Sequence, residues 1–173
     1  MKIQDVLVML NQLERDAVIK RYAIGGAVGA TFYLEPVSTL DVDVFIAFKQ
    51  QPGSMLISPA PIFDYLKGFG CKMEGEHIVI GGWPVQFLPA SGSLLEEALA
   101  GAGEVDVAGV STRVLSAEYL AAIALQTGRA KDKARLLAFI EAKAIDSAHF
   151  QEIVSRHGLT AQWQRFQQQF LAS

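Results

Sequence analysis

The stretch YAIGGAVGATFYLEPVSTLDVDVFIAF, residues 22–48, carries the two strongest structural signals of the chain. An apolar run ends in the pair Gly25 and Gly26, and a later β-branched and aromatic run contains Asp41 and Asp43. Aspartate is disfavoured in strands, and a buried carboxylate is costly unless a cation or hydrogen bonds compensate it. Residues two apart on a strand lie on the same face, so this stretch predicts two neighbouring carboxylates on a central strand.

This pairing of glycines and aspartates favours phosphate and metal chemistry. Two carboxylates on one face can hold a divalent cation, and Mg²⁺ is preferred when phosphate oxygens complete its coordination. Gly25 and Gly26 close a strand and open a short helix, where a backbone without Cβ atoms can approach a phosphate. Phosphoryl transfer needs both parts. Two simpler interpretations stay open: the aspartates cap a turn at a strand edge, or the glycines form only a tight turn.

Outward from this stretch, the hydrophobic pattern predicts an α+β fold. A 3.6-residue period over residues 3–20 indicates an amphipathic helix, and residues 60–70 indicate another. Residues 76–90 resemble a hairpin, and residues 104–115 a second strand pair around Gly109. Four further segments between residues 116 and 172 are helical in pattern. We therefore expect a small mixed β-sheet core with flanking helices in residues 1–115, and a C-terminal helical bundle in residues 116–173 packed on it.

Capping signals mark several of these helices. Ser93 and Glu96 have the spacing of a capping box, and Asp146 and Thr160 stand where N-caps are expected. Gly128 stands where a C-cap is expected.

Composition narrows the class of protein. The chain has 173 residues, 51% of them hydrophobic, which is enough for one compact core. It lacks a run of eighteen apolar residues and a basic-then-apolar leader, so we expect neither a membrane span nor a signal peptide. The single Cys71 favours a reducing, cytoplasmic compartment, and the formal charge of −3 gives no overall attraction to nucleic acid. The three histidines lack metal-ligand spacing, so we assign them no chemistry: His77, His149 and His157.

One local basic cluster stands against this acidic background. The segment GRAKDKAR brings together Arg129, Lys131, Lys133 and Arg135. A solvated helix face is one interpretation, and Lys131 with Asp132 then forms an ordinary helix start. The other interpretation is a phosphate-binding turn, and Arg129 is open to either role.

Taken together, these motifs resemble a known fold. A strand, Gly-Gly, a short helix and then TLDVD, residues 39–43, look like the nucleotidyltransferase fold shared with polymerase β-type enzymes. The T-x-D-h-D form and the later TGRAKDKAR are similar to the abortive-infection toxin nucleotidyltransferases, the AbiEii group, over about residues 20–135. The resemblance implies a metal-binding and catalytic pair, a triphosphate loop and a basic helix bordering the nucleotide. The resemblance assigns catalysis and Mg²⁺ binding to Asp41 and Asp43. It assigns nucleotide binding to Gly25, Gly26 and Thr39. The basic helix that borders the nucleotide would contribute Arg129, Lys131 and Asp132.

The chain departs from that family pattern at three places. In the toxin pattern an arginine often stands two positions before the threonine, and here that position is Val37. A hydroxyl residue commonly follows the glycines, and here Ala27 stands there. Many members carry a third acidic residue, the general base, on a neighbouring strand, and the matching residue here is Gln86. An amide can orient a hydroxyl group but cannot take its proton. Carboxylates elsewhere are candidates to replace it in space: Glu74, Glu76 and Asp106.

The leading hypothesis is a Mg²⁺-dependent nucleotidyltransferase that moves a nucleoside monophosphate from a nucleoside triphosphate to a hydroxyl group of RNA or protein. The resemblance adds a toxin or phage-defence role with an antitoxin partner. The alternative is a degenerate member, marked by Gln86, that binds nucleotide or a protein partner without turnover. A third hypothesis is a small helical interaction protein in which the aspartate pair is incidental.

Overall fold

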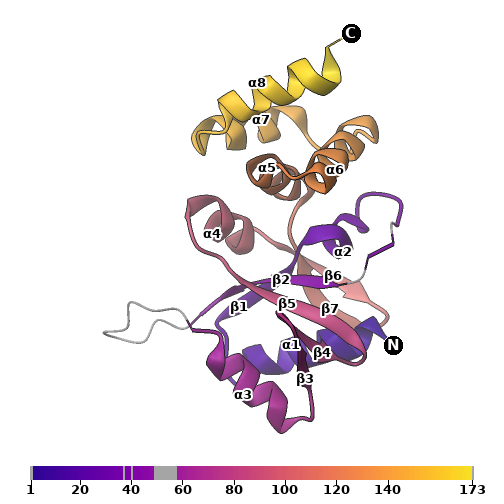
Figure 1. Ribbon diagram of the computed structural model, residues 1–173, viewed down its shortest axis with the longest axis vertical. Helices are drawn as coiled ribbons and strands as arrows, with labels where there is room; N and C mark the ends of the chain where they lie inside the picture. Colours follow the sequence, from indigo (N-terminus) through magenta and orange to yellow (C-terminus); the bar gives the residue numbers. More distant parts are fainter. Residues whose placement is uncertain (1, 37, 40, 49–57, 173) are drawn as a thin grey trace.

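A mixed β-sheet forms the centre of the molecule. The computed structural model describes residues 2–36, 38, 39, 41–48 and 58–172 of the chain. Within these residues seven strands form one sheet in the order β3-β4-β5-β2-β1-β7-β6 (Figure 1). Their bounds are β1 Arg21–Ile24, β2 Val42–Ala47, β3 Lys72–Glu74, β4 His77–Ile80, β5 Trp83–Pro89, β6 Gly103–Val107 and β7 Val110–Val114. The pairs β2·β5 and β1·β7 are parallel and the other pairs antiparallel, which confirms the predicted α+β fold with a mixed sheet.

Helices cover both faces of this sheet. Below it in Figure 1 lie α1 (Ile3–Arg15) and α3 (Ala60–Gly68), and above it lie α2 (Gly26–Ala30), α4 (Ser93–Ala100) and α5 (Ala117–Thr127). In Figure 1 α6 (Ala130–Glu141) lies beside α5, and α7 (Ser147–Arg156) and α8 (Thr160–Phe166) lie above both. A π-helical turn over Gln167–Leu171 follows α8. None of the helices in the described ranges is long and apolar enough to cross a bilayer.

Alternation along the strands separates two hydrophobic clusters. On β2, Val44 and Ile46 face the cluster that includes the buried stripe of α1, whereas Phe45 faces the cluster built on α4 to α8. Fully burying one such aliphatic side chain contributes about 1.5–3 kcal/mol, so the pattern fixes which face of β2 each residue takes. Asp43 shares the face of Phe45, because the two residues are two positions apart on the strand. The carboxylate is therefore directed to the side of the C-terminal helices.

The predicted boundary after residue 115 falls between β7 and α5. A single cluster nevertheless joins Ala23 and Phe45 of the sheet to residues of α4, α5, α6, α7 and α8. The division into a core and a helical region of residues 116–173 stays a prediction.

Two of the predicted caps are wrong. The N-cap of α4 is Gly92 rather than Ser93, and that of α8 is Leu159 rather than Thr160. The Asp146 prediction is confirmed, since its side chain accepts a hydrogen bond from the His149 N–H at 2.9 Å. The Ser93 side chain caps no helix, and its hydroxyl oxygen lies 3.2 Å from Nδ1 of His157, the C-cap residue of α7.

Candidate functional site

The aspartate pair lies at the start of β2, on the side of the C-terminal helices. Asp43 is the second residue of β2 and Asp41 precedes the strand, and both are half-buried. Burial raises the pKa of Asp43, and the nearby negative charge of Asp41 raises it further. Among the described residues, no basic side chain forms a salt bridge with Asp43. Two neighbouring carboxylates, of which that of Asp43 is desolvated, are a donor set that suits a hard divalent cation.

The glycine pair packs directly against Asp43. The Gly25 N–H donates to the Asp43 carbonyl oxygen at 3.0 Å. Gly26 begins α2 with a φ of +57°, and a Cβ atom on it would overlap Asp43 Oδ2. Only glycine fits this position, because both the backbone conformation and the space exclude a side chain. The predicted phosphate loop and the predicted metal pair are therefore adjacent in space.

Thr39 lies beside Asp41. Its hydroxyl donates to the Asp41 carbonyl oxygen at 3.1 Å and lies 3.5 Å from Asp41 Oδ1. These contacts steady the segment that leads into β2. A contact from Thr39 to a nucleotide stays a prediction.

The start of α6 folds back towards Asp43. Three positive charges lower the pKa of Asp43 and so oppose the effect of burial. Lys131 has the largest effect, followed by Arg135 and Arg129. Asp132 is 2% exposed, and its carboxylate accepts from the Arg129 backbone N–H and from Arg129 Nε at 2.7 Å. Arg135 Nη1 lies 3.7 Å from the same carboxylate. Asp132 is thus a helix-start residue that holds two arginines, while the exposed Lys131 carries a charge that acts on the aspartate pair.

Gln86 is the direct neighbour of Asp43 across the sheet. The parallel ladder of β2 and β5 pairs the two residues, so their side chains share one face. Two of the three candidate carboxylates, Glu74 and Asp106, lie on the edge strands of the sheet, away from Asp43. Glu74 is on the edge strand β3, three strands and about 14 Å from β2. Glu76 lies in the turn after β3, and Asp106 accepts from the Gly109 N–H in the β6–β7 turn at the opposite edge.

Two residues escaped the sequence prediction. His77, given no chemistry there, has its Nε2 atom 3.3 Å from Asp41 Oδ2. The signal was present in the sequence: Gly81 and Gly82 form a two-residue turn that pairs Ile80 with Trp83, and this register brings His77 towards Gln86. Arg135 lies four residues after Lys131, which places both on one face of α6.

Comparison with known proteins supports one conclusion about the fold. The sequence matches no protein-family model and no curated protein. Among solved structures, it is similar to an antigenic nucleotidyltransferase-like protein from Paracoccidioides brasiliensis, with a TM-score of 0.56 and 15% identity over 87% of this chain and 84% of that one. The fold is nucleotidyltransferase-like.

The antibiotic-resistance factor ANT(2'')-Ia has the same architecture. Its solution structure matches with a TM-score of 0.53 and 14% identity over 95% of this chain and 93% of that one. Its crystal structure in complex with adenylyl-2''-tobramycin matches with a TM-score of 0.53 and 15% identity over 95% and 99%. Identities this low bear on the fold alone, and they leave the resemblance to the abortive-infection toxin group a prediction.

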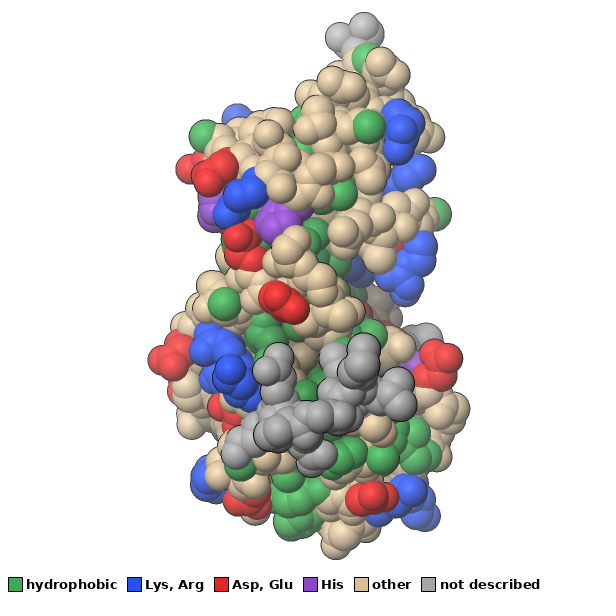
Figure 2. All heavy atoms as spheres, turned by 90° about the vertical axis from the view of Figure 1, so that its left-hand side faces the viewer, with side chains coloured by type: hydrophobic (Ala, Val, Ile, Leu, Met, Phe, Trp, Pro, Cys, Tyr) green, Lys and Arg blue, Asp and Glu red, His purple; other side chains and the backbone are tan. Residues whose placement is uncertain are grey.

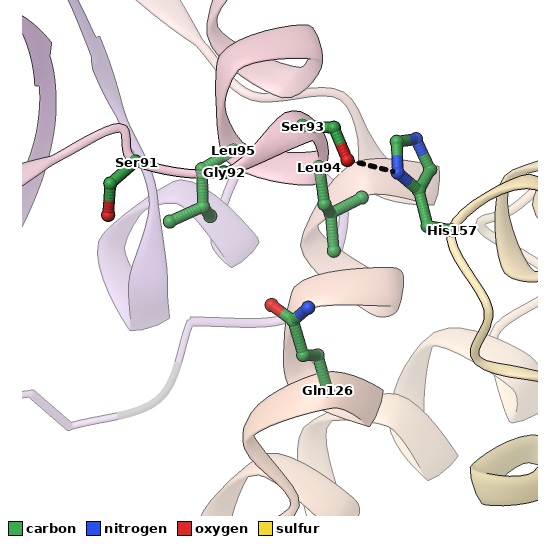
Figure 3. Close-up of a pocket in the computed structure, with 7 residues that line it drawn as sticks. All are labelled: Ser91, Gly92, Ser93, Leu94, Leu95, Gln126 and His157. Atoms are coloured by element: carbon green, nitrogen blue, oxygen red, sulfur yellow. Dashed lines mark hydrogen bonds between the residues drawn. The ribbon is translucent and has the colours of Figure 1, made fainter.

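A second cluster of polar side chains joins the core to the helical region. A pocket of about 220 Å³ lies between α4, α5 and the end of α7, where Ser93 Oγ is 3.2 Å from His157 Nδ1 (Figure 3). His157 Nε2 lies 2.8 Å from Glu97, which also accepts from Tyr119 and Arg156. These contacts lower the pKa of Glu97, and the hydrogen bond with His157 has the largest effect. In the upper half of the molecule in Figure 2, histidine side chains (purple) lie beside acidic (red) and basic (blue) ones.

The contacts of Glu97 give this cluster a structural role. Three different partners from α5, α7 and its C-cap saturate one carboxylate on α4. His157 is held at both ring nitrogens, and its side chain is only 6% exposed. The cluster ties three helices together and lies on a different part of the fold from the aspartate pair.

Proposed function

We propose that this protein is a Mg²⁺-dependent nucleotidyltransferase that transfers a nucleoside monophosphate from a nucleoside triphosphate to an acceptor hydroxyl group. One observation supports it most: on a nucleotidyltransferase-like fold, two neighbouring carboxylates, a glycine backbone and the positive charges at the start of α6 lie close to one another. If the aspartates only capped a turn or a strand edge, these three groups would not need to lie together.

Each group has a distinct task in this proposal. Asp41 and Asp43 would hold Mg²⁺, which would neutralise charge on the phosphates. The backbone at Gly25 and Gly26 and the charge of Lys131 position the triphosphate. The acceptor oxygen forms a bond to the α-phosphorus, the α–β bridging P–O bond breaks, and pyrophosphate leaves. Since Gln86 cannot take a proton, the hydroxyl proton passes to water.

The acceptor proposed here is a hydroxyl of RNA or protein, in a toxin or phage-defence setting with an antitoxin partner. This part rests on the TLDVD and TGRAKDKAR motifs. The region of residues 116–173 would shape the acceptor site, and a reducing cytoplasm would be the compartment. The ANT(2'')-Ia structure holds an adenylylated aminoglycoside, so a small hydroxyl-bearing molecule belongs among the acceptors to be tested.

A second candidate function is favoured by Gln86. Its place beside Asp43 leaves the site without a third carboxylate, and no three His, Cys, Asp or Glu side chains in the described ranges are grouped to hold a metal ion. A degenerate protein of this kind would bind a triphosphate, or a protein partner, without turning the nucleotide over.

Two measurements separate these functions. Calorimetry with Mg²⁺ and each nucleoside triphosphate tests binding, and release of pyrophosphate with α-labelled nucleotide tests turnover. Turnover that disappears in Asp41→Asn and persists in the exposed Asp64→Asn of α3 supports the enzyme. Binding without turnover in the parent, together with turnover gained in Gln86→Asp, supports the degenerate protein. Absence of any Mg²⁺-dependent nucleotide binding refutes both functions.

A further inference from the structure

The β4–β5 hairpin brings an imidazole to the aspartate pair. Its two-residue turn pairs Ile80 with Trp83 and Ile78 with Val85, and the same register continues to His77 and Gln86. Gln86 in turn pairs with Asp43. Three polar residues therefore form one row across β4, β5 and β2, on the face that carries the C-terminal helices.

Within this row His77 reaches past Gln86 to Asp41. The His77 Nε2 atom lies 3.3 Å from Asp41 Oδ2, and the two side chains are 29% and 37% exposed. They are thus shielded but open to an ion. Two atoms that ligate one octahedral cation in adjacent positions lie about 3 Å apart when each metal–ligand distance is about 2.1 Å. The two side chains already have the spacing of donors that share a cation.

The second carboxylate lies next to this pair. Asp41 and Asp43 are two residues apart at the start of β2, so the two carboxylates flank one region. No ready-made group of three ligands exists among the described residues. His77 and Asp41 are the preset pair, and Asp43 with nucleotide phosphates would complete the coordination.

We propose that His77 ligates the divalent cation together with Asp41 and Asp43, and that this imidazole makes the site prefer Mn²⁺ to Mg²⁺. Imidazole nitrogen binds transition-metal ions better than Mg²⁺, which favours oxygen ligands and keeps its water. The inference rests on the proposed function, since it concerns the same site. It differs from a role in which His77 only donates a hydrogen bond to Asp41.

The test is electron spin echo spectroscopy on the whole protein loaded with Mn²⁺. Ligation by His77 produces ¹⁴N modulation of the Mn²⁺ signal, and His77→Gln abolishes it while keeping a donor for Asp41. His149→Gln is the matched control, because His149 is exposed on α7 and should leave the modulation intact. Calorimetry should show Mn²⁺ binding at least about tenfold tighter than Mg²⁺ in the parent. His77→Gln should weaken Mn²⁺ by about 10–100-fold and Mg²⁺ much less.

Each other outcome overturns a defined part. Mn²⁺ binding without ¹⁴N modulation, or with the same affinity in His77→Gln, overturns the ligand role and leaves the proposed function standing if Asp43→Asn still abolishes binding. Mn²⁺ binding that is indifferent to both Asp41→Asn and Asp43→Asn overturns the inference and the proposed metal site together. Equal melting temperatures of parent and His77→Gln in the absence of metal show that the comparison is between folded proteins.

Discussion

Replacing Asp43 by asparagine should make the metal-free protein more stable. The Asp43 carboxylate is desolvated and repelled by Asp41, and the cations of α6 offset this only in part, because its pKa remains raised. Asparagine has nearly the same shape and no charge. Removing such a functional charge typically contributes about 0.5–2 kcal/mol. For a chain of 173 residues, about 1 kcal/mol raises Tm by about 2–4 °C.

The pH dependence of this gain has a defined sign. The folded-state pKa of Asp43 lies above its unfolded value, so the folded protein holds this proton more tightly. Below the ordinary pKa of aspartate, about pH 4, both states are protonated and the two proteins should be equally stable. The advantage of Asp43→Asn should appear as the pH rises through the folded pKa and be complete above it.

Metal should reverse the order of stability. At a concentration a hundred times Kd, a bound cation stabilises the parent by about 2.7 kcal/mol, and Asp43→Asn should gain almost nothing. Calorimetric melts at pH 7 with and without Mg²⁺ or Mn²⁺ measure both effects, with Asp64→Asn on the opposite side of the sheet as the control. If Asp43→Asn melts below the parent without metal, the carboxylate is a structural group and the reasoning fails.

Three further changes test neighbouring parts of the structure. Gly26→Ala should destabilise the protein by at least about 1 kcal/mol in urea unfolding, because its φ is positive and its Cβ would overlap Asp43; an unchanged midpoint would contradict this packing. Lys131→Ala should weaken triphosphate binding by about 1–3 kcal/mol in calorimetry with little change in Tm, whereas equal affinity would make α6 a solvated face. Glu97→Gln should lower stability by about 1 kcal/mol without changing triphosphate affinity. Since the pKa of Glu97 is lowered on folding, that loss should be full at neutral pH and vanish as the pH falls through the folded pKa.

Local patterns in the sequence were sufficient for most of the secondary structure. The stripe of α1, the β2 run and the glycine turn of the β4–β5 hairpin each depend on residues within a few positions of one another. The capping predictions at Ser93 and Thr160 failed because capping depends on which residue first leaves the helical conformation. In α4 the first residue outside the helix is Gly92, and the Ser93 hydroxyl group contacts His157, which is 64 residues away in the sequence.

The aspartate pair and the glycine loop were predictable as neighbours, because a short helix and one connection join β1 to β2. The other contacts of the site are non-local. Lys131 and Arg135 act on Asp43 from about 90 residues away, and Gln86 meets Asp43 only because β5 pairs with β2 in parallel. Periodicity states which face a residue takes, but it does not state which strand or helix lies opposite that face. That choice is made by burial of the whole sheet between its two helical layers, so only the tertiary structure brought His77 to Asp41.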